Sequence, residues 1–142
     1  MNEKVLLVDD EEDFLEVMGE RLMSRGIDVT TSASAEDALE QIEKDIFDAV
    51  ILDLQMPVMD GIDTLKKIKA RHPEIQVILL TGHATVEKGV EAIKLGAMDL
   101  VEKPADLEVL GEKIKKAHKK KMLIVDKTSK QRVIDALKRY GF

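Results

Sequence analysis

The sequence predicts an α/β fold in which helices cover both faces of one five-stranded parallel sheet. Short apolar runs alternate along the chain with longer segments whose apolar residues recur at helical spacing. Strands that are joined through helices pair in parallel, because each parallel crossover needs a long connection. Two of the runs, 49–52 and 77–80, are apolar throughout, which is typical of strands buried on both faces. Together these observations predict the doubly wound α/β class.

Five strands and five helices are expected, in strict alternation. The strands are predicted at 4–8, 27–31, 49–52, 77–80 and 98–101. The helices are predicted at 11–24, 35–44, 62–71, 85–95 and from 105 to about 120. Gly26 and Gly96 follow two of these helices, where glycine commonly ends a helix, and Ser34 is placed to cap the second helix.

The composition limits the classes of function. The 142 residues are 44% hydrophobic, which is enough for one domain core and a short extension. The net charge of −6 and the aromatic content of 3% argue against direct nucleic-acid binding by this chain. The chain has no cysteine, its first residues do not resemble a signal peptide, and it has no apolar stretch of membrane-spanning length. We therefore expect a cytoplasmic protein that does not enter the membrane.

Residues that can perform chemistry stand where the predicted strands end. Asp9 and Asp10 follow the first strand, Asp53 follows the third, Thr81 follows the fourth and Lys103 follows the fifth. Ligands of doubly wound sheets bind outside the carboxyl ends of the strands. We therefore expect these five side chains to line one pocket.

The residue types in this predicted pocket indicate phosphoryl chemistry. Three carboxylates at close range repel one another unless a cation joins them. The group offers oxygen ligands, which select a hard ion, and Mg²⁺ is the first choice. A carboxylate such as Asp53 can attack phosphorus and become an aspartyl-phosphate. Lys103 and Thr81 can then bind the phosphoryl oxygens.

These residues lie within four segments, "LLVDDEE", "DLQMPVMDG", "LLTGHA" and "GAMDLVEKP". Each segment alone is a weak or moderate signal, but all four in this order, each at a predicted strand end, are specific. In this arrangement the chain resembles the receiver domain of two-component response regulators, over roughly residues 3 to 120. The resemblance implies a flavodoxin-like sheet with the strand order 2-1-3-4-5.

The resemblance also implies a role for each site residue. Asp53 would accept a phosphoryl group from a phosphohistidine on a sensor histidine kinase or phosphotransfer protein. Asp10 and Asp53 would bind Mg²⁺ directly, together with the backbone carbonyl of Gln55. Asp9 would act through a metal-bound water, and Lys103 would contact the phosphoryl group.

A conformational switch is implied as well. Thr81 would move toward the phosphoryl group and pass on the signal. The family often has an aromatic residue three positions before the lysine, where this chain has Leu100, so the switch is expected to depend on Thr81 and backbone movement. Gln55 and His83 occupy positions that influence the phosphate lifetime in the family. Pro104 is expected to follow a cis peptide bond.

The predicted function is therefore a phosphorylation-dependent binding switch, which catalyses only its own phosphorylation and dephosphorylation. Its output would be the binding of a target or a second copy, through the face formed by the fourth helix, fifth strand and fifth helix, or through the C-terminal tail. One alternative is a phosphohydrolase with an aspartate nucleophile, but Gln55 stands where that chemistry needs a general acid. The other alternative is a pseudo-receiver that binds partners without phosphorylation, and the complete residue set argues against it.

The resemblance ends near residue 120, so residues 1–120 are expected to form the receiver domain and 121–142 a C-terminal extension. We favour a helical extension, in which Thr128 or Ser129 caps a second helix. Alternatively, this tail is the start of a truncated second receiver-like unit, because its pattern echoes the first strand and helix. His118 lies among lysines and is expected on a solvated helix face.

Overall fold

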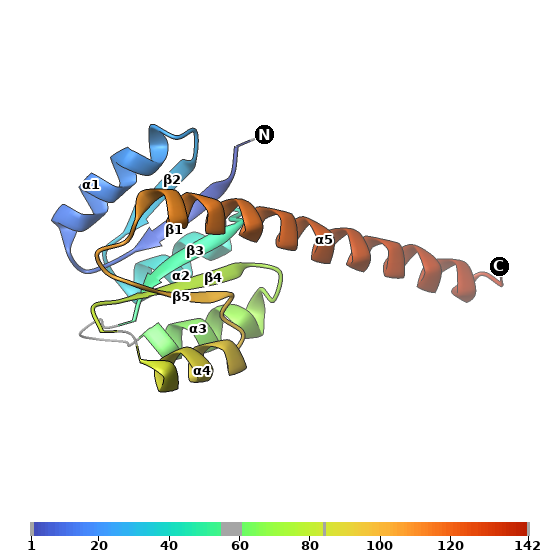
Figure 1. Ribbon diagram of the computed structural model, residues 1–142. Coiled ribbons are helices and arrows are strands. Elements are labelled where there is room, and N and C mark those ends of the chain that lie inside the picture. The colour runs from blue at the N-terminus through green and yellow to red at the C-terminus, as the bar shows by residue number, and fades with distance from the viewer. Residues whose placement is uncertain (1, 55–60, 84, 142) are drawn as a thin grey trace.

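Five parallel strands form a single sheet in the order β2-β1-β3-β4-β5, and helices cover both of its faces (Figure 1). The computed structural model describes residues 2–54, 61–83 and 85–141. The strands are β1 Lys4–Val8, β2 Asp28–Ser32, β3 Ala49–Asp53, β4 Gln76–Thr81 and β5 Asp99–Glu102. The helices are α1 Glu12–Met23, α2 Ala35–Lys44, α3 Gly61–Arg71, α4 Val86–Lys94 and α5 Leu107–Arg139. The predicted fold class and strand order are confirmed.

The two faces of the sheet support two separate hydrophobic cores. Side chains alternate between the faces along each strand, so Val50 and Leu52 pack in one core and Ala49 and Ile51 in the other. The first core includes apolar residues of α2, α3 and α4, and the second includes those of α1 and α5. Every residue of β3 and β4 is buried. This explains why both strands have continuous apolar runs, and it makes β3 a rigid support for the residue at its end.

Local signals place several helix ends where the sequence predicts them. The Ser34 hydroxyl accepts a hydrogen bond from the backbone N–H of Asp37, which confirms the predicted cap of α2. Gly26 and Gly96 have φ values of 84° and 102°, a region that L side chains rarely adopt. Two strands are displaced by one residue from their predicted positions: β2 spans Asp28–Ser32 instead of 27–31, and β5 spans Asp99–Glu102 instead of 98–101.

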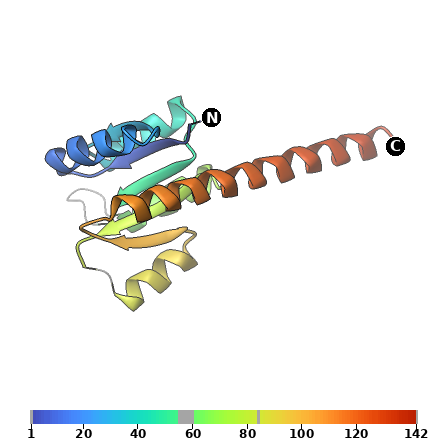
Figure 2. The same cartoon turned by 45° about the horizontal axis from the view of Figure 1, so that its top comes forward.

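The last helix differs most from the prediction. α5 continues without a break to Arg139, and its second half runs past the sheet and away from the other elements (Figures 1 and 2). The helical extension is confirmed, but the expected second helix is wrong, because the Thr128 hydroxyl donates to the carbonyl of Ile124 inside one helix. Residues 122–125, which a second receiver-like unit would use as a strand, are also helical. The domain boundary between 120 and 121 stays a prediction.

No helix in the described residues, 2–54, 61–83 and 85–141, is long and apolar enough to span a membrane.

Candidate functional site

The register of the sheet brings the acidic residues together. Val8 of β1 pairs with Leu52 of β3, so the next residues, Asp9 and Asp53, leave the sheet at the same level. Asp53 is held by its place at the end of the buried strand β3, and Asp9 by a hydrogen bond from its backbone N–H to the carbonyl of Ser32 on β2. Two neighbouring strands therefore place two carboxylates side by side at the carboxyl-terminal ends of the strands.

Asp10 completes a group of three carboxylates. One oxygen from each of Asp9, Asp10 and Asp53 lies within 4.8 Å of one oxygen from each of the others. Asp9 and Asp53 are buried, with 0% and 5% of their surface exposed, whereas Asp10 is exposed. In the described part of the chain, this is the one group of three or more acidic or histidine side chains that is close enough to share a metal ion.

Lys103 supplies a positive charge to this group. Its Nζ lies 2.6 Å from Asp9 Oδ2, 3.7 Å from Glu11 Oε1 and 4.4 Å from the centre of the Phe14 ring. Burial lowers the pKa of Lys103, but the hydrogen bond to Asp9 and the charges of Asp9, Asp53 and Glu11 outweigh burial, so its pKa is raised above 10.5. Lys103 is therefore a stable cation at neutral pH, and it compensates part of the negative charge of the three carboxylates.

Thr81 ends β4 beside β3, and its side chain is fully buried. The Thr81 hydroxyl accepts a hydrogen bond from the backbone N–H of His83 at 3.2 Å and donates to the carbonyl of His83 at 3.3 Å. The carbonyl of Thr81 also accepts a hydrogen bond of 2.7 Å from the backbone N–H of Lys103. Thr81 thus joins the chain before α4 to the segment that carries the lysine.

Gly61 closes the chain onto the end of β3. Its backbone N–H donates to the carbonyl of Leu54 at 2.8 Å. A Cβ atom at this position would lie 2.6 Å from the Cα of Leu54 and 2.8 Å from the carbonyl oxygen of Asp53. Both of these are backbone atoms, so a side chain at position 61 would displace the backbone that carries Asp53. Only glycine fits this close approach.

The three carboxylates are suitable ligands for Mg²⁺. Magnesium takes oxygen ligands at about 2.1 Å, so two ligands on opposite sides of the ion are about 4.2 Å apart. Neighbouring ligands of such an ion are only about 3.0 Å apart. The three carboxylate oxygens lie within 4.8 Å of one another, so to share one ion they would move closer together or bind it in part through its water ligands. The exposure of Asp10 leaves access for the water ligands that magnesium usually keeps.

The remaining predicted site residues fall into two groups. Gln55 lies outside the described residues, so its predicted role as a carbonyl ligand stays a prediction. Leu100 on β5 is partly buried and packs against the core beneath α2, α3 and α4, and His83 is exposed. The Lys103–Pro104 peptide bond is cis, as the resemblance implies.

Two features were not recognised in the sequence. Phe14 was not singled out as a site residue, but its ring lies against the Lys103 ammonium. His118 was expected on a solvated face, and that expectation is wrong, because its Nδ1 lies 2.9 Å from Oδ1 of the buried Asp48. Lys121 is buried beside the same carboxylate, at 3.7 Å. His118 and Lys121 lie four residues after core residues of α5, and this spacing was the available signal.

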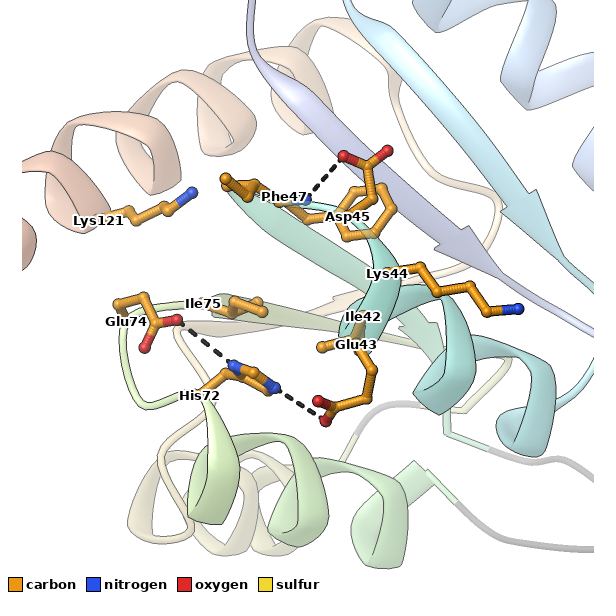
Figure 3. Close-up of a pocket in the computed structure, with 10 residues that line it drawn as sticks. Ile42, Glu43, Lys44, Asp45, Phe47, His72, Glu74, Ile75 and Lys121 are labelled. Carbon is orange, nitrogen blue, oxygen red and sulfur yellow. Dashed lines mark hydrogen bonds and ion pairs between the residues drawn. The ribbon is translucent and has the colours of Figure 1, made fainter.

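A pocket of about 260 Å³ lies near these residues (Figure 3). Most of its lining precedes β3 and β4, so it lies at the opposite ends of these strands from Asp53. Phe47 and Ile75 form its apolar part, and Lys121 contributes from α5. His72 lies between two acids, 3.0 Å from Glu43 and 3.6 Å from Glu74. These contacts join α2 to the segment between α3 and β4, so the pocket has a structural explanation that is separate from the carboxylate site.

The comparison with known families agrees with the geometry of the carboxylate site. Residues 5–115 match the family model described as the response regulator receiver domain. The chain belongs to the response regulator receiver family. The match covers strands β2 to β5 and helices α1 to α4 completely, and β1 and α5 in part. It therefore includes the three carboxylates of the site and Lys103.

Curated relatives of this receiver include transcriptional regulatory proteins. ZraR of Salmonella typhimurium is 41% identical over 113 residues, which cover 80% of this chain and 26% of that protein. The C4-dicarboxylate transport regulator DctD of Rhizobium meliloti is 36% identical over 132 residues, which cover 93% of this chain and 29% of that protein. The chain therefore spans only about a quarter of the length of these relatives, and the match to DctD includes part of the extension of α5.

A solved structure is similar over most of the receiver. The beryllofluoride-activated NtrC4 receiver domain dimer is 35% identical, with a TM-score of 0.78 over 83% of this chain and 98% of that chain. At this level of identity, the similarity concerns the family as well as the fold. It connects the chain to receivers of two-component signal transduction.

Proposed function

We propose that this receiver takes a phosphoryl group on Asp53 from the phosphohistidine of a sensor histidine kinase or phosphotransfer protein. The observation that carries the proposal is the group of three carboxylates within 4.8 Å of one another, with the Lys103 ammonium 2.6 Å from Asp9. Asp53 is the last residue of the central strand β3, in which every residue is buried, so its backbone is held firmly. A rigid nucleophile favours attack on phosphorus in a fixed direction.

In the proposed reaction, a carboxylate oxygen of Asp53 attacks phosphorus, the P–N bond breaks, and the imidazole leaves with the bonding electrons. Asp9, Asp10, Asp53 and the carbonyl of Gln55 would hold Mg²⁺, which would neutralise charge on the phosphoryl oxygens. Lys103 is already at the site and would bind one phosphoryl oxygen as its bond to Asp9 is exchanged.

Thr81 would convert this chemistry into a change of shape. Its hydroxyl is bonded to the backbone of His83, and it must leave these partners to reach a phosphoryl oxygen. We propose that this movement changes the chain before α4 and, with it, the face formed by α4, β5 and α5. Leu100, Gln55 and His83 would tune the switch or the lifetime of the phosphate.

The output would be binding, by a target or by a second copy of the chain, with no external substrate turned over. The NtrC4 receiver, which is a dimer when activated by beryllofluoride, supports a homodimer through the same face or through the extension of α5. We place the protein in the cytoplasm and expect no direct binding of nucleic acid by this chain, in agreement with its net charge of −6.

The test compares the wild type with Asp53→Asn, incubated with Mg²⁺ and acetyl phosphate or a phosphorylated kinase domain. We expect one acid-labile phosphoryl group per wild-type chain and none on the variant, with intact-protein mass spectrometry as the readout. Equal labelling of both proteins, or labelling of neither, would refute the proposal. Multiple turnover of a small phosphomonoester would instead support a phosphohydrolase, and partner binding that ignores Asp53→Asn would support a pseudo-receiver.

The binding output has a separate test. Light scattering after size-exclusion chromatography gives the mass of the protein with Mg²⁺ alone and with Mg²⁺ plus beryllofluoride. A change from monomer to dimer in the wild type, absent in Asp53→Asn, is the expected result for a homodimeric output. An unchanged mass would exclude the homodimer and leave a different protein as the target.

A further inference from the structure

Lys88 lies in the first turn of α4 and reaches back toward the switch residue. Its backbone N–H donates to the Thr85 hydroxyl at 3.1 Å, which caps α4. Its side chain makes a different bond, since Nζ donates to the carbonyl of His83 at 3.2 Å. The cap uses only the backbone of Lys88, so the ammonium is not needed to begin the helix.

The carbonyl that Lys88 binds is the one that Thr81 uses. The Thr81 hydroxyl donates to the His83 carbonyl at 3.3 Å and accepts from the His83 N–H at 3.2 Å. One backbone residue, His83, therefore holds the threonine hydroxyl with both of its polar groups. The ammonium of Lys88 fixes the same residue from the side of α4.

We propose that Lys88 is a positioning residue of the switch, which holds the backbone of His83 in the arrangement that binds the Thr81 hydroxyl. The bond from the Lys88 ammonium to the His83 carbonyl is charge-assisted. If the backbone of His83 rotates, or moves together with Thr81, this bond is lost. Lys88 thereby raises the free energy of the state in which Thr81 faces the phosphoryl group. This consequence for activation rests on the proposed function of Asp53, but the contact between Lys88 and His83 does not.

The expected size of the effect is modest. Lys88 is half-buried, but its hydrogen bond to His83 lies at the surface, so water competes for the ammonium and the bond stabilises the inactive arrangement only weakly. We expect removal of the ammonium to shift the switch equilibrium by about three- to fivefold. A shift of this size is measurable as tighter binding of a phosphoryl mimic, which selects the active state.

The chain has no tryptophan, so NMR spectroscopy is the appropriate assay. Lys88→Gln removes the charge, and Lys88→Arg keeps a cationic donor as the conservative variant. Lys94→Gln is the matched control, because it removes a lysine from the last turn of the same helix. Two quantities are measured: hydrogen exchange of the His83 amide without ligand, and the affinity for beryllofluoride with Mg²⁺.

In the ligand-free protein, Lys88→Gln should speed exchange of the His83 amide by about three- to fivefold, whereas Lys88→Arg and Lys94→Gln should match the wild type. Unchanged exchange in Lys88→Gln would overturn the proposal. This measurement needs no phosphoryl chemistry, so it decides the role of Lys88 even if Asp53 proves not to be the acceptor.

With beryllofluoride, Lys88→Gln should bind about three- to fivefold more tightly than the wild type. The gain should vanish when Thr81 is Ala in both proteins, because Lys88 acts through the threonine. A gain that persists in full in the Thr81→Ala background, or that Lys94→Gln reproduces, would show a general charge effect and refute the positioning role.

Discussion

Removal of the Lys103 ammonium tests the electrostatics of the receiver site most directly. In Lys103→Met, an apolar side chain of similar length can keep contact with the Phe14 ring while the charge is lost. Asp9, which is fully buried, then retains the hydrogen bond from the Glu11 backbone N–H at 2.8 Å but loses its ammonium partner at 2.6 Å. The charge of the three carboxylates is no longer compensated within the site.

The magnitude follows from burial and charge. Removal of one partner from a buried ion pair costs about 3 to 5 kcal/mol, because the other charge stays buried and unpaired. Lys103 has 18% of its side chain exposed, and its removal also relieves its own cost of burial, so the expected loss falls below this range. We expect a loss of about 2 kcal/mol in the free energy of unfolding without Mg²⁺, or about 6 °C in Tm for a chain of this size.

The assay is thermal and urea unfolding at pH 7 without Mg²⁺, and Lys113→Met is the matched control. Lys113 pairs with Asp99 between α5 and β5, and the two side chains are 25% and 36% exposed, so its loss should cost less than about 1 kcal/mol. Added Mg²⁺ should reduce the deficit of Lys103→Met, because the ion supplies positive charge to the same carboxylates. Equal stability of the two variants without Mg²⁺ would refute the assigned electrostatics.

The pH dependence of this deficit has a definite sign. The folded-state pKa of Lys103 is raised above 10.5, so its stabilising effect is fully present below pH 10.5 and is lost as the pH rises through the folded value. The stability difference between wild type and Lys103→Met should therefore be constant from neutral pH to about pH 10 and shrink at more alkaline pH.

Three further predictions concern other parts of the receiver. Gly61→Ala should cost about 1 to 3 kcal/mol and slow labelling of Asp53, since its Cβ would lie 2.6 Å from the backbone of Leu54; urea unfolding and acetyl phosphate labelling measure both effects. Asp48→Asn should cost about 1 to 3 kcal/mol and increase hydrogen exchange in the α5 extension, whereas Asp126→Asn should change stability by less than about 0.5 kcal/mol. In the Lys4–Asp45 pair, the hydrogen bond between the side chains lowers the pKa of Asp45 and raises that of Lys4. Asp45→Asn should therefore be less stable than the wild type only at pH values between the two pKa values. Well below pH 3.8 and well above pH 10.5 the two proteins should be equally stable.

The fold could be predicted because its signals are local and agree with one another. The apolar runs at 49–52 and 77–80 became the two fully buried strands, and the Ser34 cap was found where expected. The exact ends of a strand were harder to predict where they depend on pairing with a neighbouring strand. β5 has mixed polar and apolar residues, so its one-residue displacement follows from pairing with β4, which the local sequence does not contain.

The carboxylate site was predictable because a parallel sheet gathers the ends of its strands. Once Asp9, Asp53 and Lys103 are assigned to strand ends, their proximity follows from the topology. The Asp48 contacts were not predictable in the same way. His118 was judged by its lysine-rich neighbours in sequence, whereas its partner is 70 positions away at the start of β3. The continuous helix was missed because Thr128 can cap a helix or bond within one, and tertiary context decides between these.

The strand β3 links the proposed chemistry to the extension of α5. Asp53 is the last residue of β3 and lies in the carboxylate site. Asp48 stands directly before the first residue of β3, at the other end of the strand, where it contacts His118 and Lys121. Beyond Lys121, α5 continues for about 27 Å to Arg139. A tilt of about 10° at the Asp48 contact would therefore move the far end of the helix by about 5 Å. Lys121 is the last buried residue of α5, so any change in the angle of the helix at this contact would be amplified along the exposed extension.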